Sequence, residues 1–167
     1  MIETEKFIIK PLTYYQLLKY LKCDNSLEEE LNLNKNSRTI APELVEAFES
    51  TILPNVADTS KNYLFSTLWT GILKAENKMV GDICIVGEPN EIGEIEIGYG
   101  TYDEYKGKGY MTEMVSGIIL WAKSQANVQS IIASTNKDNV ASFKVLEKNN
   151  FKKIGETEEL LNWKLAF

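Results

Sequence analysis

The residues that most clearly suit a chemical role, by their type and their spacing, form a glycine loop, residues 106–113, with the sequence KGKGYMTE. Glycines let the backbone approach a ligand closely, and the apolar residues that follow Gly109 recur at helical spacing. A helix N-terminus presents unpaired N–H groups and the positive end of the helix dipole, a combination that holds phosphates. Lys106 and Lys108 add positive charge. The loop therefore predicts an anion site, and the alternative is a plain tight turn whose glycines serve geometry only.

Two familiar phosphate-binding motifs do not fit this loop. A dinucleotide fingerprint, G-x-G-x-x-G, needs a small third residue where Thr112 stands, and it opens a βαβ unit rather than following a meander. A P-loop needs G-x-x-x-x-G-K-[ST], which the chain lacks. A nucleotide bound here would have to be held in another way.

Composition excludes several kinds of chemistry. The chain has 167 residues and no histidine, so Ser-His-Asp triads, Cys-His pairs and His-ligated metal sites are ruled out. Its formal charge is −6 and Arg38 is its single arginine, whereas binding to a phosphate backbone needs a dense basic surface. We therefore expect no nucleic-acid partner and no metal, and a cationic substrate suits the acidic chain better.

The cysteines and the start of the chain indicate the cellular setting. Cys23 and Cys84 are far apart and belong to no metal-ligand pattern, so we expect free, buried thiols in a reducing compartment. The first residues lack the basic end and apolar stretch of a signal peptide. The longest hydrophobic run, around residues 118–122, is too short to span a membrane. We expect a cytoplasmic protein without a membrane partner.

The pattern of apolar and turn residues predicts one α/β domain over residues 1–167. One early helix is capped by Thr13, and another follows Pro42 and closes at Pro54. The acidic run at 28–30 is expected to be a solvated helix face. The remaining elements are expected as strands at 7–11, 64–73, 79–86, 92–102, 131–135, 151–157 and 160–165, with helices from 110 to about 126 and from 140 to 149.

The order of these elements, together with the glycine loop, resembles the GNAT family of acyl-CoA-dependent N-acyltransferases. The resemblance is strongest to its branch of ribosomal-protein N-terminal acetyltransferases. The family's [QR]-x-x-G-x-[GA] loop falls on residues 106–111, with departures at Lys106 and Met111. The preceding segment, 94–99, resembles the family's fourth strand.

Two further signatures of the family have counterparts later in the chain. Residues 136–142 resemble N-x-x-N-x-x-S, and residues 147–151 resemble E-K-x-G-F with Asn150 in place of the usual glycine. Three weak motifs in the right order and spacing make the resemblance specific. It implies the GNAT fold, a mixed, mostly antiparallel central sheet of about seven strands flanked by helices.

The resemblance also implies acetyl-CoA as the cofactor. Backbone amides of the glycine loop would hold the pyrophosphate, and a bulge would splay the strand ending near Gly100 from its neighbour to admit the pantetheine. An amide near Gly100 would face the thioester carbonyl, an oxyanion-hole role worth about 3–4 kcal/mol in proteases. Asn136 and Asn139 would contact the pantetheine or simply cap a helix. The implied cofactor-binding residues are Gly100, Thr101, Lys106, Gly107, Lys108, Gly109, Tyr110, Met111, Thr112, Asn136 and Asn139.

Two side chains are candidates for proton transfer. An alkyl amine with a pKa of about 10.4 is neutral in only about one molecule in 2,500 at pH 7, so a proton must be removed. Glu96 lies on the strand that the resemblance places at the reaction centre, although it would equally suit the solvated side of a half-buried strand. Many relatives protonate the thiolate with a tyrosine, where Leu146 stands here. Ser142 matches the serine proposed for this role in the ribosomal-protein branch, and a bond to its own helix is the alternative.

The sequence thus predicts direct transfer of an acetyl group from acetyl-CoA to a primary amine of a peptide N-terminus or a small molecule, without an acyl-cysteine. The alternatives are a non-catalytic module that binds or senses acyl-CoA, which the departures at Met111, Leu146 and Asn150 favour, and an interaction domain without a ligand. No segment identifies the acceptor. A monomer and a homodimer both stay open, because Trp163 and Phe167 suit a dimer contact or the core.

Overall fold

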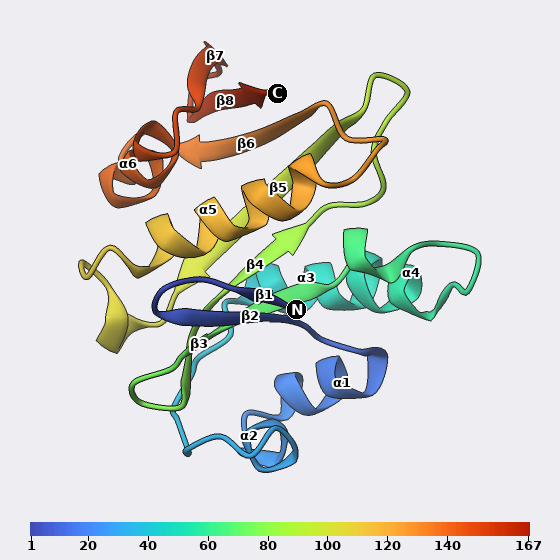
Figure 1. The fold of residues 1–167 in the computed structure, drawn as a ribbon, viewed down its shortest axis with the longest axis vertical. Helices are drawn as coiled ribbons and strands as arrows, with labels where there is room; N and C mark the ends of the chain where they lie inside the picture. The colour runs from blue at the N-terminus through green and yellow to red at the C-terminus, as the bar shows by residue number, and fades with distance from the viewer.

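The computed structural model describes residues 1–167, and its centre is one open sheet of eight strands (Figure 1). Neighbouring strands are antiparallel except β5 and β6, which run parallel. The strands, in their order across the sheet, are β1 (Ile2–Glu3), β2 (Phe7–Pro11), β3 (Leu68–Leu73), β4 (Lys78–Ile85), β5 (Glu94–Thr101), β6 (Ser130–Asn136), β8 (Leu160–Ala166) and β7 (Lys152–Glu156). The predicted mixed, mostly antiparallel sheet is confirmed. The expected count of about seven strands is one too low, because the two residues of β1 pair with β2 and are too short to show a pattern.

The helices begin and end largely where capping chemistry places them. Thr13 caps α1 as predicted, since its hydroxyl accepts from the Gln16 amide while the Gln16 side chain accepts from the Thr13 amide. None of the helices has both the length and the apolar character needed to cross a bilayer. The helical elements are α1 (Tyr14–Lys22), α2 (Ser26–Glu30), α3 (Pro42–Ala47), a π-helical turn η1 (Phe48–Ile52), α4 (Leu53–Ala57), two 3₁₀ turns η2 (Tyr63–Phe65) and η3 (Asp103–Tyr105), α5 (Tyr110–Lys123) and α6 (Val140–Lys148).

Helices cover both faces of the sheet and bury two cores. The larger core lies between the sheet and α5 with α6, and the smaller lies between the opposite face and α1 to α4. Gly71 of β3 fixes how closely α5 approaches, because a Cβ there would lie only 2.2 Å from the Met114 Cε atom. Met114 and Ile118 are fully buried at this contact. The position of the α5 N-terminus is therefore set by packing against the sheet.

The parallel pair of β5 and β6 separates soon after it forms. Their register covers only Glu94 to Glu96, opposite Ser130 to Ile132. Beyond this point β5 stays paired with β4 as far as Thr101, whereas β6 continues beside β8 as far as Asn136. Figure 1 shows the two strands diverging on the side where α6 lies. Residues 97–101 of β5 therefore have one paired edge and one open edge.

Three local expectations are wrong. Pro54 does not end its helical region, because it lies in the first turn of α4, where proline is tolerated, and η1 joins α3 to α4. The acidic run is not uniformly solvated, since Glu28 is fully buried while Glu29 and Glu30 are exposed. Cys23 is exposed rather than buried, because it is the C-terminal cap of α1 in a left-handed conformation with φ of 52°.

Arg38 explains the burial of Glu28. Its guanidinium pairs with the Glu28 carboxylate, donates to the Tyr20 carbonyl oxygen at 2.9 Å and lies 4.5 Å from the centre of the Tyr20 ring. The two charged side chains are only 2% and 0% exposed. The pair therefore ties the segment before α3 to both α1 and α2, and each charge is buried only because the other compensates it.

Removing one member of this pair should destabilise the protein far more than removing both. Arg38→Met leaves the Glu28 carboxylate buried without a partner, so the free energy of unfolding should fall by about 3–5 kcal/mol. The double variant Glu28→Met/Arg38→Met should recover much of that loss, because an apolar pair of similar volume is often nearly neutral. Urea unfolding of the two variants and the wild type measures this, and a double variant less stable than Arg38→Met would contradict it.

Candidate active site

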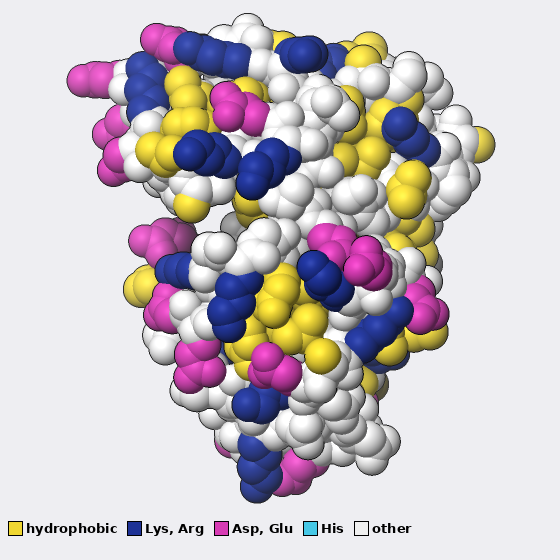
Figure 2. All heavy atoms as spheres, turned by 60° about the vertical axis from the view of Figure 1, so that its left-hand side comes forward, with side chains coloured by type: hydrophobic (Ala, Val, Ile, Leu, Met, Phe, Trp, Pro, Cys, Tyr) yellow, Lys and Arg dark blue, Asp and Glu magenta, His cyan; other side chains and the backbone are white.

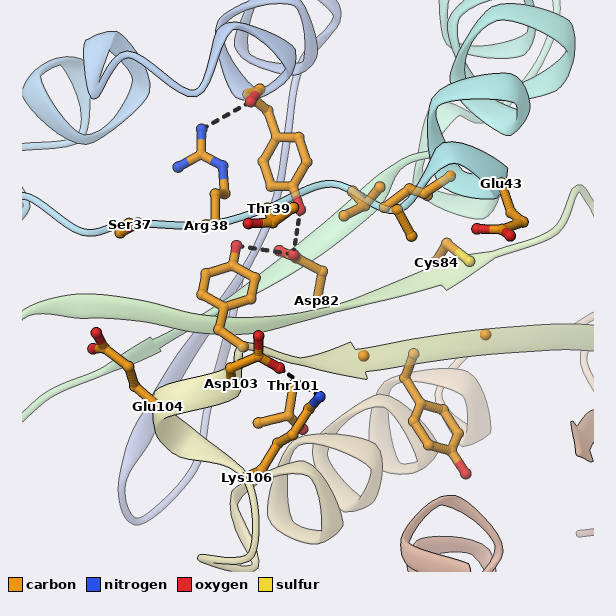
Figure 3. Close-up of a pocket in the computed structure, with 18 residues that line it drawn as sticks. Ser37, Arg38, Thr39, Glu43, Asp82, Cys84, Thr101, Asp103, Glu104 and Lys106 are labelled. Carbon is orange, nitrogen blue, oxygen red and sulfur yellow. Dashed lines mark hydrogen bonds and ion pairs between the residues drawn. The ribbon is translucent and has the colours of Figure 1, made fainter. Parts of the chain in front are cut away.

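Two pockets meet at residues 99–101 of β5. The pocket shown in Figure 3, about 710 Å³ in volume, opens toward α3 and the segment 37–41. The other, about 700 Å³, opens toward the N-terminus of α5 and the first turns of α6. Both volumes are typical of small-molecule sites. Figure 2 brings this side of the molecule forward and shows its surface hollowed between an upper and a lower part, with Lys and Arg side chains on both sides.

The two pockets differ in charge. The pocket at α5 and α6 has three lysines and no carboxylate in its lining, namely Lys106, Lys144 and Lys148, and we call it the basic pocket. The pocket at α3 is lined by four carboxylates and two cations, and we call it the acidic pocket. Its charged residues are Arg38, Glu43, Asp82, Asp103, Glu104 and Lys106. Arg38 is neutralised by Glu28, and the Lys106 ammonium by Asp103 at 2.6 Å, so the pocket as a whole favours a cation.

The N-terminus of α5 opens into the basic pocket without a cap. Gly109 is the N-cap residue, with φ of 76°, and no side chain accepts a bond from the first turn. Gly107 also has a positive φ, 75°, and a Cβ built on either glycine meets no atom within 4 Å. Uncapped N–H groups, open space above two glycines and nearby lysines together form a site suited to phosphates.

The one carboxylate in the first turn of α5 is directed elsewhere. Glu113 accepts from the Thr4 hydroxyl at 2.7 Å and from the Lys6 amide at 2.8 Å, both in the connection between β1 and β2. On the other side, the Asn149 side-chain amide donates to the Thr112 carbonyl oxygen at 3.1 Å. The first turn of α5 is thus held against α6 with its negative charge kept outside the basic pocket.

The open edge of β5 presents two backbone N–H groups toward this pocket. The Tyr102 amide donates to the Val80 carbonyl oxygen on β4 at 2.9 Å, and the register of β4 and β5 is regular up to that point. Successive amides of a strand point to alternate sides, so the Gly100 amide also faces β4. The amides of Tyr99 and Thr101 face the open edge. The Gly100 amide itself is therefore turned away from the basic pocket, and the amides of its two neighbours are the ones that face it.

A pair of hydroxyl groups lies where the pockets meet. The Tyr99 hydroxyl donates to the Ser142 carbonyl oxygen at 2.9 Å, and the Ser142 hydroxyl donates to the Tyr99 oxygen at 3.4 Å. Burial raises the pKa of Tyr99 to about 12, so it is protonated at neutral pH. Tyr99 lines both pockets, and Ser142 lines the basic one. The sequence analysis did not single out Tyr99.

The floor of the acidic pocket is formed by paired glycine and polar residues. Gly100 of β5 lies opposite Asp82 of β4, and Gly98 lies opposite Cys84. A Cβ at Gly100 would meet nothing within 4 Å, so the missing side chain leaves the space above Asp82 open. Burial raises the pKa of the Cys84 thiol, which therefore stays protonated and weakly nucleophilic.

Most residues predicted to bind the cofactor line the basic pocket, and three predicted site residues line neither pocket. Lys108 lies over the ring of Tyr105 at 5.0 Å, and Asn136 is exposed at the end of β6. Glu96 is half-buried on β5, beyond the residues that reach the pockets. Those that line the basic pocket are Gly100, Thr101, Lys106, Gly107, Gly109, Tyr110, Met111, Thr112, Asn139 and Ser142. Asn139 also caps α6 by accepting from the Ser142 amide at 3.1 Å.

Lys144 and Lys148 of the basic pocket were missed by the sequence analysis. Their spacing of four residues places them on one side of α6, the helix that follows the Asn139 cap. Basic residues at this spacing, just after a motif assigned to cofactor binding, were a usable signal. Asp82 was missed as well, and its position depends on strand register that the sequence does not display.

Comparison with known proteins identifies the family of the chain. The family model of the acetyltransferase (GNAT) domain matches residues 29–152. A protein named uncharacterized N-acetyltransferase YjdG, from Bacillus subtilis (strain 168), is 28% identical over 166 residues, which cover 98% of this chain and 96% of that protein.

Solved structures of similar fold include two enzymes that act on ribosomal proteins. Ribosomal-protein-S5-alanine acetyltransferase from Vibrio fischeri is 18% identical, with a TM-score of 0.65 over 98% of this chain and 94% of that one. The ribosomal L7/L12 α-N-protein acetyltransferase RimL, solved in complex with coenzyme A, is 12% identical, with a TM-score of 0.69 over 98% of this chain and 96% of that one. The family match and the relative from Bacillus subtilis together show that the chain belongs to the GNAT family and is an N-acetyltransferase.

Proposed function

We propose that the protein holds acetyl-CoA in the basic pocket and transfers the acetyl group directly to a primary amine bound in the acidic pocket. The observation that carries the proposal is the meeting of two oppositely charged pockets at residues 99–101 of β5. A phosphate-rich cofactor suits Lys144, Lys148 and an uncapped helix N-terminus, whereas an ammonium group suits the surplus of carboxylates. The acceptor is a peptide N-terminus or a small-molecule amine, preferably one that carries further positive charge.

The residues of the basic pocket fit the anionic part of coenzyme A. The pyrophosphate would lie against the amides of the loop from Gly107 to Met111, and Lys144 and Lys148 supply positive charge from α6. Lys106 stands between the two pockets. When bound, the cofactor supplies an activated acetyl thioester. The pantetheine would lie along the open edge of β5, where unpaired amides can meet it as a neighbouring strand would.

The open amides of Tyr99 and Thr101 are the donors that stabilise negative charge on the thioester carbonyl oxygen. Such a donor acts on charge that develops during the reaction, and losing one costs about 3–4 kcal/mol in proteases. Transfer needs no cysteine, because the Cys84 thiol in the acidic pocket is kept protonated by burial and Cys23 lies at the exposed end of α1. The amine nitrogen forms the new C–N bond as the C–S bond breaks.

The leaving thiolate takes its proton from the hydroxyl pair of Tyr99 and Ser142. Tyr99 is the donor at the junction of the pockets, and the Ser142 hydroxyl, directed at the Tyr99 oxygen, can return a proton to it. This arrangement combines the expected role of Ser142 with the tyrosine role that many relatives assign to the position of Leu146. The side chain of Leu146 is fully buried in the core.

Acetyl transfer should depend on the charge of the acceptor. With acetyl-CoA saturating, kcat/KM for a peptide whose N-terminus is followed by lysines should exceed that for an acidic peptide of equal length by about tenfold, and the difference should shrink as salt is added. Thiol release measured across a panel of peptides and small amines tests this. Equal rates for acidic and basic acceptors at low salt would contradict the acidic-pocket assignment, and no transfer to any amine would contradict the proposed function.

Gly109→Asp should abolish tight binding of coenzyme A. The new carboxylate would project into the open space at the α5 N-terminus and repel the pyrophosphate, which should weaken binding by about 100-fold or more. Calorimetric titration with CoA and with acetyl-CoA measures the affinities. The matched control is Gly87→Asp, because Gly87 also has a positive φ, 90°, and open space around it, but lies outside both pockets. Equal affinity in folded Gly109→Asp and in the control would dismiss the loop as the cofactor site.

Tyr99→Phe should lower kcat while leaving the affinity for acetyl-CoA nearly unchanged. Loss of a general acid typically costs 10²- to 10⁴-fold, so we expect kcat to fall by about 100-fold. Ser142→Ala should reduce kcat by a smaller factor, because Tyr99 keeps its bond to the backbone carbonyl of residue 142. Endpoint assays of thiol release measure kcat, and calorimetry measures the affinity for CoA. Together they separate an effect on catalysis from an effect on cofactor binding. Full activity in Tyr99→Phe alongside a large loss in Ser142→Ala would assign the proton donor to the serine alone.

A further inference from the structure

Asp82 is a buried carboxylate placed beside the junction of the two pockets. It lies on β4 directly opposite Gly100, lines the acidic pocket and is 7% exposed. Because Gly100 has no side chain, nothing from β5 covers this position on the pocket face. In Figure 3 Asp82 lies at the centre of the pocket, with two hydrogen bonds converging on its carboxylate. It is the only acidic residue of the acidic pocket that lies on a strand of the sheet.

One oxygen of Asp82 is held and the other has no partner. The Tyr20 hydroxyl donates to Oδ2 at 2.7 Å, and the Tyr102 hydroxyl donates to the same atom at 2.9 Å. The Oδ1 atom is buried and makes no hydrogen bond. A buried carboxylate oxygen without a donor is costly, because nothing replaces the hydrogen bonds to water that it has lost. The Thr70 hydroxyl, which is also buried without a hydrogen bond, faces the carboxylate from β3. Because a carboxylate oxygen can accept more than one hydrogen bond, Oδ1 keeps an acceptor position for a donor supplied by a ligand.

The surroundings of Asp82 set its proton affinity. Tyr20 faces it from α1, Thr70 from the opposite position on β3, Tyr102 from the end of β5, and Arg38 from the segment before α3. Burial is the largest influence and raises the pKa of the carboxyl, while these four neighbours act to lower it. A carboxylate whose pKa is raised above its usual range is a better proton acceptor at neutral pH.

We propose that Asp82 is a catalytic residue that receives the ammonium group of the acceptor and removes its proton. This role rests on the proposed function. One N–H bond of the ammonium breaks, its proton passes to the Asp82 carboxylate, and the electron pair left on nitrogen forms the C–N bond to the acetyl carbon. As the C–S bond breaks, the thiolate takes the Tyr99 hydroxyl proton. The nitrogen then loses its second proton, which restores the Tyr99 hydroxyl, so that the products are the neutral amide, the CoA thiol and one proton on Asp82. Asp82 then loses its proton to solvent through the acidic pocket, and Tyr20 and Tyr102 act as positioning residues that hold Oδ2.

Asp82→Asn is the direct test, because it keeps the shape of the side chain and removes its basicity. We expect kcat/KM for the amine to fall by about 100-fold, with the calorimetric affinity for CoA unchanged. The matched control is Asp58→Asn, which makes the same change at a half-buried aspartate outside both pockets and should keep near wild-type activity. Circular dichroism and thermal unfolding show whether each variant is folded.

The pH profile separates a proton acceptor from a purely structural carboxylate. In the wild type, kcat/KM should rise with pH as Asp82 loses its proton. In Asp82→Asn, this rise, which is the acidic limb of the pH profile, should vanish, and kcat/KM should follow only the pKa of the free amine. Tyr20→Phe removes a hydrogen bond that lowers the pKa of Asp82, so its acidic limb should move to higher pH.

The outcomes distinguish this inference from the proposed function. A wild-type protein that binds no CoA, or transfers acetyl to no amine, overturns the proposed function. A wild type that transfers acetyl, together with a folded Asp82→Asn of equal rate and identical pH profile, overturns the role of Asp82 alone. A loss of rate in Glu96→Gln with the acidic limb removed would assign the base to Glu96 instead. An unfolded Asp82→Asn leaves Tyr20→Phe as the deciding variant, and an unshifted acidic limb there contradicts the inference.

Discussion

The parting of β5 from β6 after Glu96 is the constraint on which the rest of the site depends. A backbone N–H that is removed from water needs an acceptor, and a strand in the middle of a sheet normally finds one on each side. Residues 97–101 keep their partners on β4 and lose those on β6. Two amides therefore face the basic pocket from a position that the rest of the sheet holds rigidly. A ligand with a chain of amides can occupy this edge with little cost in ordering the protein.

The same stretch of β5 separates two electrostatic environments. On one side, the dipole of α5 together with Lys144 and Lys148 favours an anion, and Glu113 is bound to the β1–β2 connection instead. On the other side, Arg38 balances Glu28 and supports Tyr20, whose hydroxyl in turn holds Asp82. This chain of contacts links the loop before α3 to the floor of the acidic pocket. Glycines at 98 and 100 weaken the strand by about 0.5–1 kcal/mol each, and in exchange they keep the floor open.

The sequence predicts elements with strong periodicity and chemistry that is local in the chain. The helix after Gly109, the Thr13 cap and the mostly antiparallel sheet all follow from short patterns and are confirmed. What depends on pairing between distant segments could not be predicted. Glu28 is part of an acidic run, and only the packing of Arg38 against Tyr20 shows that it is buried.

The proposed base, Asp82, could not be predicted from the sequence for the same reason. Alternation places Glu96 on one face of its strand, but which carboxylate reaches the pocket is decided by what covers that face and by the register with β4. Asp82 belongs to a different strand, and nothing in its own neighbourhood of the sequence marks it.

Asn150 shows how a departure from the family pattern can preserve its geometry: it ends α6 with φ of 65°, a left-handed conformation that asparagine tolerates. Met111 packs in the larger core and also lines the basic pocket, and Leu146 belongs to the same core. The hydroxyl groups of Tyr99 and Ser142 lie together where the two pockets meet, and for this reason we propose them for the proton transfer that a leucine at position 146 cannot perform.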